Sequence, residues 1–143
     1  MIRQHIVFLT GACIISESEI PTFRGKDGLW NGERKVYLAS SEALHNDTSE
    51  LLAFKNDMRQ RVFDTAPNVA HTFITDLEKQ HQVTVITQSI ADLHERTGST
   101  NVIHLHGELA RVCSSDNSHD ARYIREMSMN VPIRLGDNAG DVS

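Results

Sequence analysis

The residues best suited to chemistry follow an apolar run near the N-terminus. Residues 6–9 (Ile-Val-Phe-Leu) have the length and composition of a buried β-strand, and Gly11 stops this run just before a stretch of helix length. The backbone N–H groups of such a turn, with the positive end of the following helix, can hold a pyrophosphate. The usual dinucleotide-binding turn carries three glycines, and Cys13 and Ser16 stand where the second and third would be. The turn predicts a phosphate site, although the signal is unspecific by itself.

Histidines form a second group of interest. His104 and His106 alternate onto one face of a predicted strand and could begin a metal site, but no third ligand is placed nearby. The two cysteines, Cys13 and Cys113, lie far apart in sequence and cannot build a zinc site of paired cysteines. We therefore expect no metal.

A hydrolase built from Ser89, Asp92 and His94 is another alternative. A nucleophilic serine of that kind sits in a Gly-x-Ser-x-Gly turn, and no such turn surrounds Ser89. The sequence therefore disfavours this chemistry.

Three segments predict parallel strands that would position these residues. The strands are expected over residues 5–10, 83–87 and 101–105, and the second is β-branched throughout. Each is followed by a polar loop, and the loops after parallel strands meet at the carboxyl edge of a sheet, where open α/β sheets bind ligands. These loops hold residues 11–24, residues 88–92 and His106. The expected fold class is α/β, with a partial, doubly wound, Rossmann-like parallel sheet of about three strands.

The remaining segments complete a single predicted domain over residues 1–143. Residues 33–63 and 69–80 carry apolar residues at roughly helical spacing, and the first of these segments would be a helical insertion. Residues 110–143 show no clear periodicity and are expected to be mostly irregular.

Composition excludes several classes of partner. The chain has 143 residues, of which 39% are hydrophobic and 23% charged, with a formal net charge of −5 and no basic stripe. Nucleic-acid binding is therefore not expected. No apolar run approaches the ~20 residues needed to cross a bilayer. The N-terminus leads into a strand without a signal-peptide pattern, so we expect no membrane association and a cytoplasmic location.

Two blocks of sequence, in order and at the right spacing, resemble the sirtuins, a family of NAD-dependent protein-lysine deacylases. The first block comprises residues 11–30, including Gly11-Ala12, Glu17-Ser18 and Ile20-Pro21-Thr22-Phe23-Arg24, and the second comprises residues 87–96 and 102–109. The lack of paired cysteines resembles the zinc-free bacterial branch. The resemblance covers nearly the whole chain but only about the first half of the family's domain.

This resemblance implies an NAD cofactor, an acyl-lysine protein substrate and a catalytic base. The base would be His106, whose ordinary pKa near neutrality suits proton abstraction from a ribose hydroxyl. The implied cofactor-binding residues are Gly11, Ala12, Cys13, Glu17, Ile20, Thr22, Phe23, Arg24, Trp30, Gln88, Ser89, Ile90 and His106.

Several residues depart from the family pattern. Ser89 replaces an asparagine that positions ribose and water, and Ala91 replaces an aspartate that holds the nicotinamide carboxamide. Cys13 replaces a glycine of the cofactor turn, and Glu19 replaces a glycine that ends the first helix in the family. Loss of two such contacts removes several kcal/mol of transition-state stabilisation, at roughly 1.5–3 kcal/mol each where charge is involved. We therefore expect weak or no turnover.

The preferred acyl group and the partner are open at this point. Sirtuins that remove negatively charged acyl groups carry Tyr-x-x-Arg in the small-lobe helix, and Lys55 and Met58 stand at the matching positions. Half of the family's sheet would leave a bare edge strand that invites association with another chain. Two further functions compete with deacylation: a catalytically inactive sirtuin-like remnant or binding module, and NAD hydrolysis or ADP-ribosyl transfer.

Overall fold

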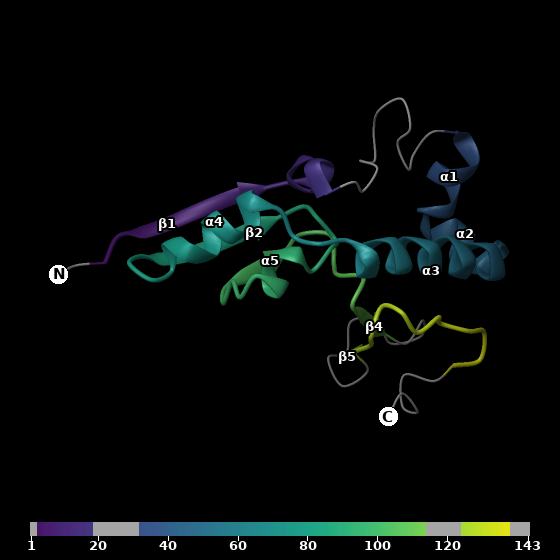
Figure 1. Ribbon diagram of the computed structural model, residues 1–143. Helices are drawn as coiled ribbons and strands as arrows, with labels where there is room; N and C mark the ends of the chain where they lie inside the picture. The colour runs from purple at the N-terminus through teal and green to yellow at the C-terminus, as the bar shows by residue number, and fades with distance from the viewer. Residues whose placement is uncertain (1–2, 19–31, 114–123, 138–143) are drawn as a thin grey trace.

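The structure, a computed structural model, describes residues 3–18, 32–113 and 124–137. Figure 1 shows the parallel strands with helices α4 and α5 at one end of the molecule, and helices α1 to α3 at the other. The elements in chain order are β1 (His5–Thr10), a 3-10 helix η1 (Ala12–Ser18), α1 (Glu33–Leu38), α2 (Ser41–Asn46), α3 (Thr48–Asp64), α4 (Val69–Leu77), β2 (Gln82–Thr87), α5 (Leu93–Arg96), β3 (Val102–His104), β4 (Arg111–Cys113) and β5 (Ile124–Glu126).

Three strands form the parallel sheet that the sequence predicts. Their order is β1-β2-β3, with Phe8 opposite Val85 and Ile86 opposite Ile103. The observed strand bounds all lie within one residue of the predicted ones, with β3 one residue shorter at each end, and the α/β fold class is confirmed. Because all three strands run in the same direction, their carboxyl ends lie along one edge of the sheet.

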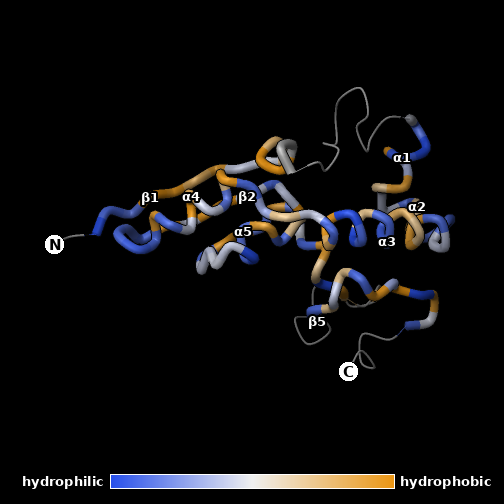
Figure 2. Tube along the Cα trace, in the orientation of Figure 1, coloured by the Kyte–Doolittle hydropathy of each residue, from blue (hydrophilic) through white to orange (hydrophobic). Residues whose placement is uncertain are grey.

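One face of the sheet is covered by a helix, whereas the other face exposes apolar side chains of the two outer strands. Helix α4 contributes Ile74 to a cluster with Val83 and Val85 on the covered face. The opposite face leaves apolar side chains in contact with solvent, and Figure 2 shows β1 as a hydrophobic segment. These side chains are Val7, Leu9, Ile103 and Leu105, which are 55%, 74%, 47% and 51% exposed. They form what we call the open sheet face.

The predicted helical segment over residues 33–63 consists of three helices. The Ser40 hydroxyl caps the start of α2 by accepting a hydrogen bond from Ala43 N at 3.4 Å. A small core of Leu38, Ala43 and Leu51 holds α1 and α2 against α3. The 17 residues of α3 then reach the main hydrophobic cluster through Met58 and Val62.

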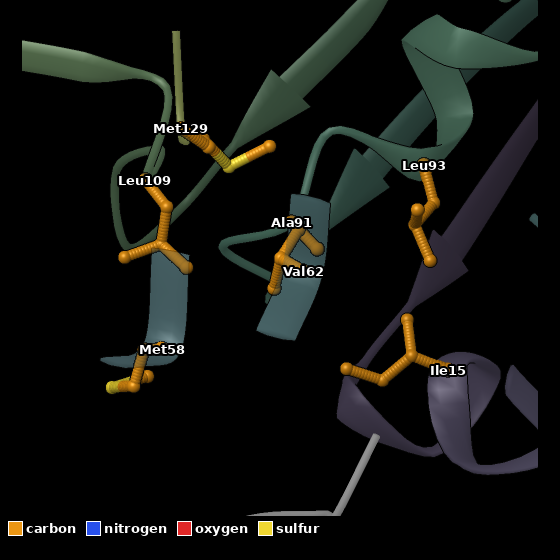
Figure 3. Packing of buried hydrophobic residues seen from close by; sticks show 7 residues of the cluster. All are labelled: Ile15, Met58, Val62, Ala91, Leu93, Leu109 and Met129. Carbon is orange, nitrogen blue, oxygen red and sulfur yellow. The ribbon is translucent and has the colours of Figure 1, made fainter. Parts of the chain in front are cut away.

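That main cluster joins α3 to the turns at the carboxyl edge of the sheet. Figure 3 shows its members converging from η1, α3, the segment around α5 and the C-terminal segment: Ile15, Met58, Val62, Ala91, Leu93, Leu109 and Met129. The cluster therefore holds the loops that carry the predicted site against a rigid helix.

The C-terminal segment has more order than its sequence indicates. Strands β4 and β5 pair antiparallel, with Val112 opposite Arg125. Each has only three residues, too few to produce a periodic pattern in the sequence, and they are the strands described in a segment expected to be mostly irregular. Within the described ranges, no helix is long and apolar enough to cross a membrane.

Candidate functional site

The loops that follow β1 and β2 lie side by side at the carboxyl edge of the sheet. Gln88 N donates a hydrogen bond to Thr10 O at 2.9 Å. A Cβ on Gly11 would lie 3.6 Å from Gln88 Oε1, so the Gln88 side chain rests beside the glycine. Two predicted site residues that are 77 positions apart are therefore in contact.

The turn after β1 is a 3-10 helix rather than an α-helix. Ile14 N donates to Gly11 O at 3.0 Å, which starts this tight helix directly at the glycine. Ala12 is half-buried and Cys13 is exposed, so both are on or near the surface at this edge. Glu17 belongs to the same helix. The predicted site residues Ile20, Thr22, Phe23, Arg24 and Trp30, and the departure Glu19, lie outside the described residues.

The loop after β2 is closed by serine and threonine side chains. Ser89 N donates to Thr87 Oγ1 at 3.0 Å, and Ala91 N donates to Ser89 Oγ at 3.2 Å. Such side-chain turns are typical of Ser, Thr, Asn and Asp. Ser89 is 2% exposed, so its buried hydroxyl stabilises the loop from within. Ala91 is 1% exposed and belongs to the apolar cluster of Figure 3.

His104 holds the end of β3 against this loop. Its Nδ1 donates to Ser89 O at 2.8 Å and its Nε2 lies 2.8 Å from Glu95 Oε1. Burial by itself lowers the pKa of His104, but the hydrogen bonds to Glu95 and to Ser89 O outweigh it, so the pKa is raised. The imidazole is therefore readily protonated and forms an ion pair with Glu95.

The same histidine belongs to the one group, within the described residues, whose spacing suits a metal ion. Ligand atoms of Glu95, His104 and Glu108 all lie within 4.8 Å of one another. This group does not include His106, so the His104–His106 pairing considered from the sequence does not form the set. The ion pair with Glu95 accounts for His104 without a metal.

His106 lies in the turn that follows β3, where Gly107 adopts a φ of +76°. Its side chain is exposed and lines a cavity of about 310 Å³. Ile90, another predicted site residue, lines this cavity too, whereas Gly11, Gln88 and Ser89 are not among the lining residues.

Helix α3 adds two cationic residues to this cavity that the sequence did not assign to the site. Lys55 and Arg59 are one helical turn apart and both line it. Burial lowers the pKa of each. Their i, i+4 spacing was visible in the sequence, but only the packing of α3 against the loop of His106 reveals that they share its cavity.

A buried pair of histidines supports the turn after β1 from the covered side. His94 Nε2 lies 3.2 Å from Thr10 Oγ1, and the His94 and His71 rings have centroids 4.8 Å apart. Burial, with smaller contributions from His94 and Arg96, lowers the pKa of His71 to about 4. Both imidazoles are neutral at pH 7 because burial also lowers the pKa of His94. These residues position the site.

Comparison with known proteins agrees with this geometry. A model of the Sir2 family matches residues 11–137. The chain is 40% identical over 139 residues to an NAD-dependent protein deacylase of Bacteroides thetaiotaomicron, covering 96% of this chain and 59% of the relative. It is 48% identical over 109 residues to an NAD-dependent protein deacylase of Aggregatibacter actinomycetemcomitans, covering 76% of this chain and 52% of the relative.

Solved structures show the same relationship. A Sir2 homologue in complex with NAD superposes with a TM-score of 0.77 at 38% identity, covering 93% of this chain and 50% of that chain. A mutant of a Sir2 homologue in complex with ADP-ribose gives a TM-score of 0.80 at 39% identity, covering 92% of this chain and 51% of that chain. The chain thus spans between half and three fifths of these relatives. With a family model that matches most of its length and a fold that superposes on solved members, the chain belongs to the Sir2 family.

Proposed function

We propose that this chain forms the cofactor-binding part of an NAD-dependent protein-lysine deacylase. The observation that carries this proposal is the arrangement of three loops, which brings Gly11, Gln88 and His106 to one edge of the parallel sheet. The names of the relatives, NAD-dependent protein deacylases, support the same function.

The residues at this edge fit the cofactor in their chemistry. Gly11 leaves its backbone uncovered except for the Gln88 side chain, so N–H groups of the turn remain approachable by phosphate. His106 is exposed on the cavity and can receive a substrate proton on its imidazole nitrogen. NAD, when bound, supplies the ribose that accepts the acyl group and the nicotinamide that leaves.

The proposed role of each residue follows from its position. The turn at Gly11–Cys13 would hold the phosphates of the cofactor, and Gln88, which lies beside Gly11, would be available to its ribose. His106 would remove a proton from a ribose hydroxyl, and its turn is fixed by Leu105 N, which donates to Thr87 O at 2.9 Å. His104 positions the Ser89 loop through its hydrogen bond to Ser89 O.

We further propose that deacylation by this chain is weak. The Ser89 hydroxyl is buried and already accepts a hydrogen bond from Ala91 N. Ala91 offers no polar group and packs among Ile15, Met58 and Leu109. A catalytically inactive module that still binds nucleotide is the second candidate function, and these two residues favour it.

The test measures NAD binding by calorimetry and nicotinamide release in the presence and absence of an acetyl-lysine peptide. We expect NAD binding, with peptide-dependent release at least tenfold slower than that of the Bacteroides relative and abolished in His106→Ala. Binding without release in any condition would select the inactive module. Release that does not need peptide would indicate NAD hydrolysis. Absence of NAD binding would contradict the proposal.

The finer proposals on partners and location rest on the same structure. We propose that the open sheet face and the outer edge of β1 are covered by a polypeptide that corresponds to the part of the relatives which this chain does not span. The 74% exposure of Leu9 and the roughly 50% coverage of solved relatives support this. We also propose a cytoplasmic location, because a chain with only two cysteines lacks the disulfide-rich composition of small secreted domains.

A further inference from the structure

Three side chains with metal-binding atoms meet beside the turn of His106. They are Glu95 on α5, His104 at the end of β3 and Glu108 in the turn that follows, and one ligand atom from each lies within 4.8 Å of the other two. None of the three is among the residues proposed to bind NAD. The environment of His104 indicates what this cluster can hold.

His104 lies between two hydrogen-bond acceptors. Its Nδ1 is 2.8 Å from Ser89 O, a carbonyl oxygen that can only accept, so the proton of a neutral imidazole is placed on Nδ1. Its Nε2 then presents a lone pair, and the atom that faces it at 2.8 Å is Glu95 Oε1, which as a carboxylate oxygen also only accepts. Two lone pairs approach this closely only with a cation between them. That cation is either a second proton, as in the ion pair with Glu95, or a metal ion.

The hydrogen bond to Ser89 O is of the kind that metal-binding histidines make. Such a histidine donates its other ring N–H to a main-chain carbonyl or a carboxylate, which fixes the tautomer and the orientation of the ring. The side chain of His104 is only 3% exposed, so packing holds the ring as well. Nε2 is therefore directed toward Glu95 before any ion binds.

The turn at Gly107 brings a second carboxylate, that of Glu108, back to His104. Gly107 has a φ of +76°, which residues with a Cβ rarely adopt. The far side of this turn is anchored, because Leu109 N donates to Ile90 O at 2.9 Å. A proton on Nε2 needs only one acceptor, whereas a metal ion needs several ligands. The presence of Glu108 therefore favours a metal ion.

The charges and distances of the cluster suit a divalent ion. Two carboxylates and a neutral imidazole carry two negative charges, which a divalent cation balances. Tetrahedral coordination by nitrogen and oxygen at about 2.0–2.2 Å separates two ligand atoms by roughly 3.3 Å. The 2.8 Å between His104 Nε2 and Glu95 Oε1 must then widen slightly, and the side chain of Glu95, which is 37% exposed, is free to move outward.

One cationic side chain already lies near the cluster. Arg111 is 3.5 Å from Glu108 Oε1 and 3.7 Å from Glu126 Oε1. The Arg111 side chain is 50% exposed, so its ion pair with Glu108 is weak. Arg111 can stay paired with Glu126 while Glu108 binds a metal ion.

We propose that Glu95, His104 and Glu108 form a binding site for a divalent transition-metal ion of the Zn²⁺ class, in which the ion takes the place of the second proton on His104. One nitrogen and two carboxylate ligands suit Zn²⁺ better than Mg²⁺ or Ca²⁺, which prefer oxygen ligands. Three protein ligands leave a fourth position open to water.

The proposed metal site does not depend on the proposed deacylase function. The expectation of no metal, drawn from the sequence, changes because the partners of His104 are Glu95 and Glu108 rather than His106. Glu108 also lines the cavity that contains His106. A bound ion would therefore tie α5 to the turn that carries the proposed base.

The experiment titrates Zn²⁺ into the 143-residue chain without NAD or peptide and follows binding by isothermal titration calorimetry. We expect a site that binds Zn²⁺ at least a hundredfold more tightly than Mg²⁺. In a chain whose histidines are labelled with nitrogen-15, Zn²⁺ is expected to shift the Nε2 resonance of one of the 8 histidines while its Nδ1 keeps its proton. The nitrogen-15 measurement uses the unmodified chain, so it does not depend on whether a variant folds.

Variants locate the ligands. His104→Asn removes Nε2 but keeps an N–H group near the position from which Nδ1 donates to Ser89 O, and Glu108→Gln removes a charged ligand. Each is expected to weaken Zn²⁺ binding at least tenfold. Glu126→Gln is the matched control, because Glu126 also lies near Arg111 but is outside the cluster, and it is expected to retain the affinity.

The outcomes separate this inference from the proposed function. Binding of Zn²⁺ no tighter than that of Mg²⁺ would overturn the inference, as would an affinity that survives both His104→Asn and Glu108→Gln. Loss of binding in Cys113→Ser alone would assign the ion to an exposed thiol and also overturn it. None of these results would affect NAD binding, and failure of NAD to bind would leave the metal site intact.

Discussion

Asn68 Nδ2 donates a hydrogen bond of 2.6 Å to the main-chain oxygen of Ile14. The same side chain caps α4, since its Oδ1 accepts from Ala70 N at 3.0 Å. One asparagine therefore ties the start of a helix to the turn that follows β1. This contact helps to explain how a turn with few glycines keeps a defined shape.

We expect Asn68→Ala to lower the free energy of unfolding by about 1–2 kcal/mol, since both the helix cap and the link to Ile14 are lost. Asn68→Ser is the control, because a serine can cap the helix but lacks the amide Nδ2 that donates to Ile14 O. Urea denaturation would show a smaller loss for serine than for alanine. Equal losses would mean that the link to Ile14 contributes nothing.

Acidification is expected to destabilise the protein through His71. Its pKa is about 4 in the folded state and 6.5 in the unfolded state, so the unfolded chain binds more protons between these values. Stability therefore falls as the pH drops from about 6.5 to about 4, by roughly 3 kcal/mol for this residue.

The measurement is the free energy of unfolding in urea at pH 7, 5.5 and 4.5 for the unmodified chain and for His71→Gln. The glutamine variant cannot titrate, so its pH dependence is expected to be shallower. His45→Gln, at an exposed helix position, serves as control. A slope in His71→Gln as steep as in the unmodified chain would contradict the assignment.

Restoring the aspartate of the family pattern at position 91 is expected to destabilise this chain. Ala91 is 1% exposed among apolar side chains, so Ala91→Asp would bury a carboxylate and lower stability at pH 7 by more than about 2 kcal/mol. Burial raises the pKa of such a group, so the loss grows as the pH rises above the ordinary aspartate value of about 3.9. Urea midpoints at pH 4 and pH 7, with Ala91→Asn as the neutral control, would test this. A fully stable Ala91→Asp chain would mean that the loop opens toward solvent.

The open sheet face is expected to mediate association. Leu9→Lys should weaken binding to the polypeptide that covers this face, or to another copy of the chain, at least tenfold in sedimentation velocity. Its effect on the free energy of unfolding should stay within about 0.5 kcal/mol because Leu9 is 74% exposed. Val36→Lys, at an apolar position on α1 that is 45% exposed, is the matched control. Unchanged association in Leu9→Lys would exclude this face.

The sequence alone determined the order of the three parallel strands along the chain and the residues that follow them. Apolar runs such as 83–87 are local signals, because a strand buried on both faces needs apolar or β-branched residues throughout. Local sequence signals of the same kind predicted the helices, and they placed Gly11, Gln88 and His106 just after the ends of strands. The short β4–β5 pair lacked any such signal, because three residues are too few to define a period.

Only the tertiary structure decided what these residues contact. That the Ser89 hydroxyl bonds within its own loop, that His104 pairs with Glu95, and that Lys55 and Arg59 share a cavity with His106 all depend on how the chain packs. Side-chain environments arise from packing between helices and strands. Neither the hydrophobic pattern nor the secondary-structure propensity of a segment specifies that packing. For that reason the sequence determined which residues stand at the edge of the sheet. The packing of α3 against that edge decided that the cationic side chains of Lys55 and Arg59 line the same cavity as His106.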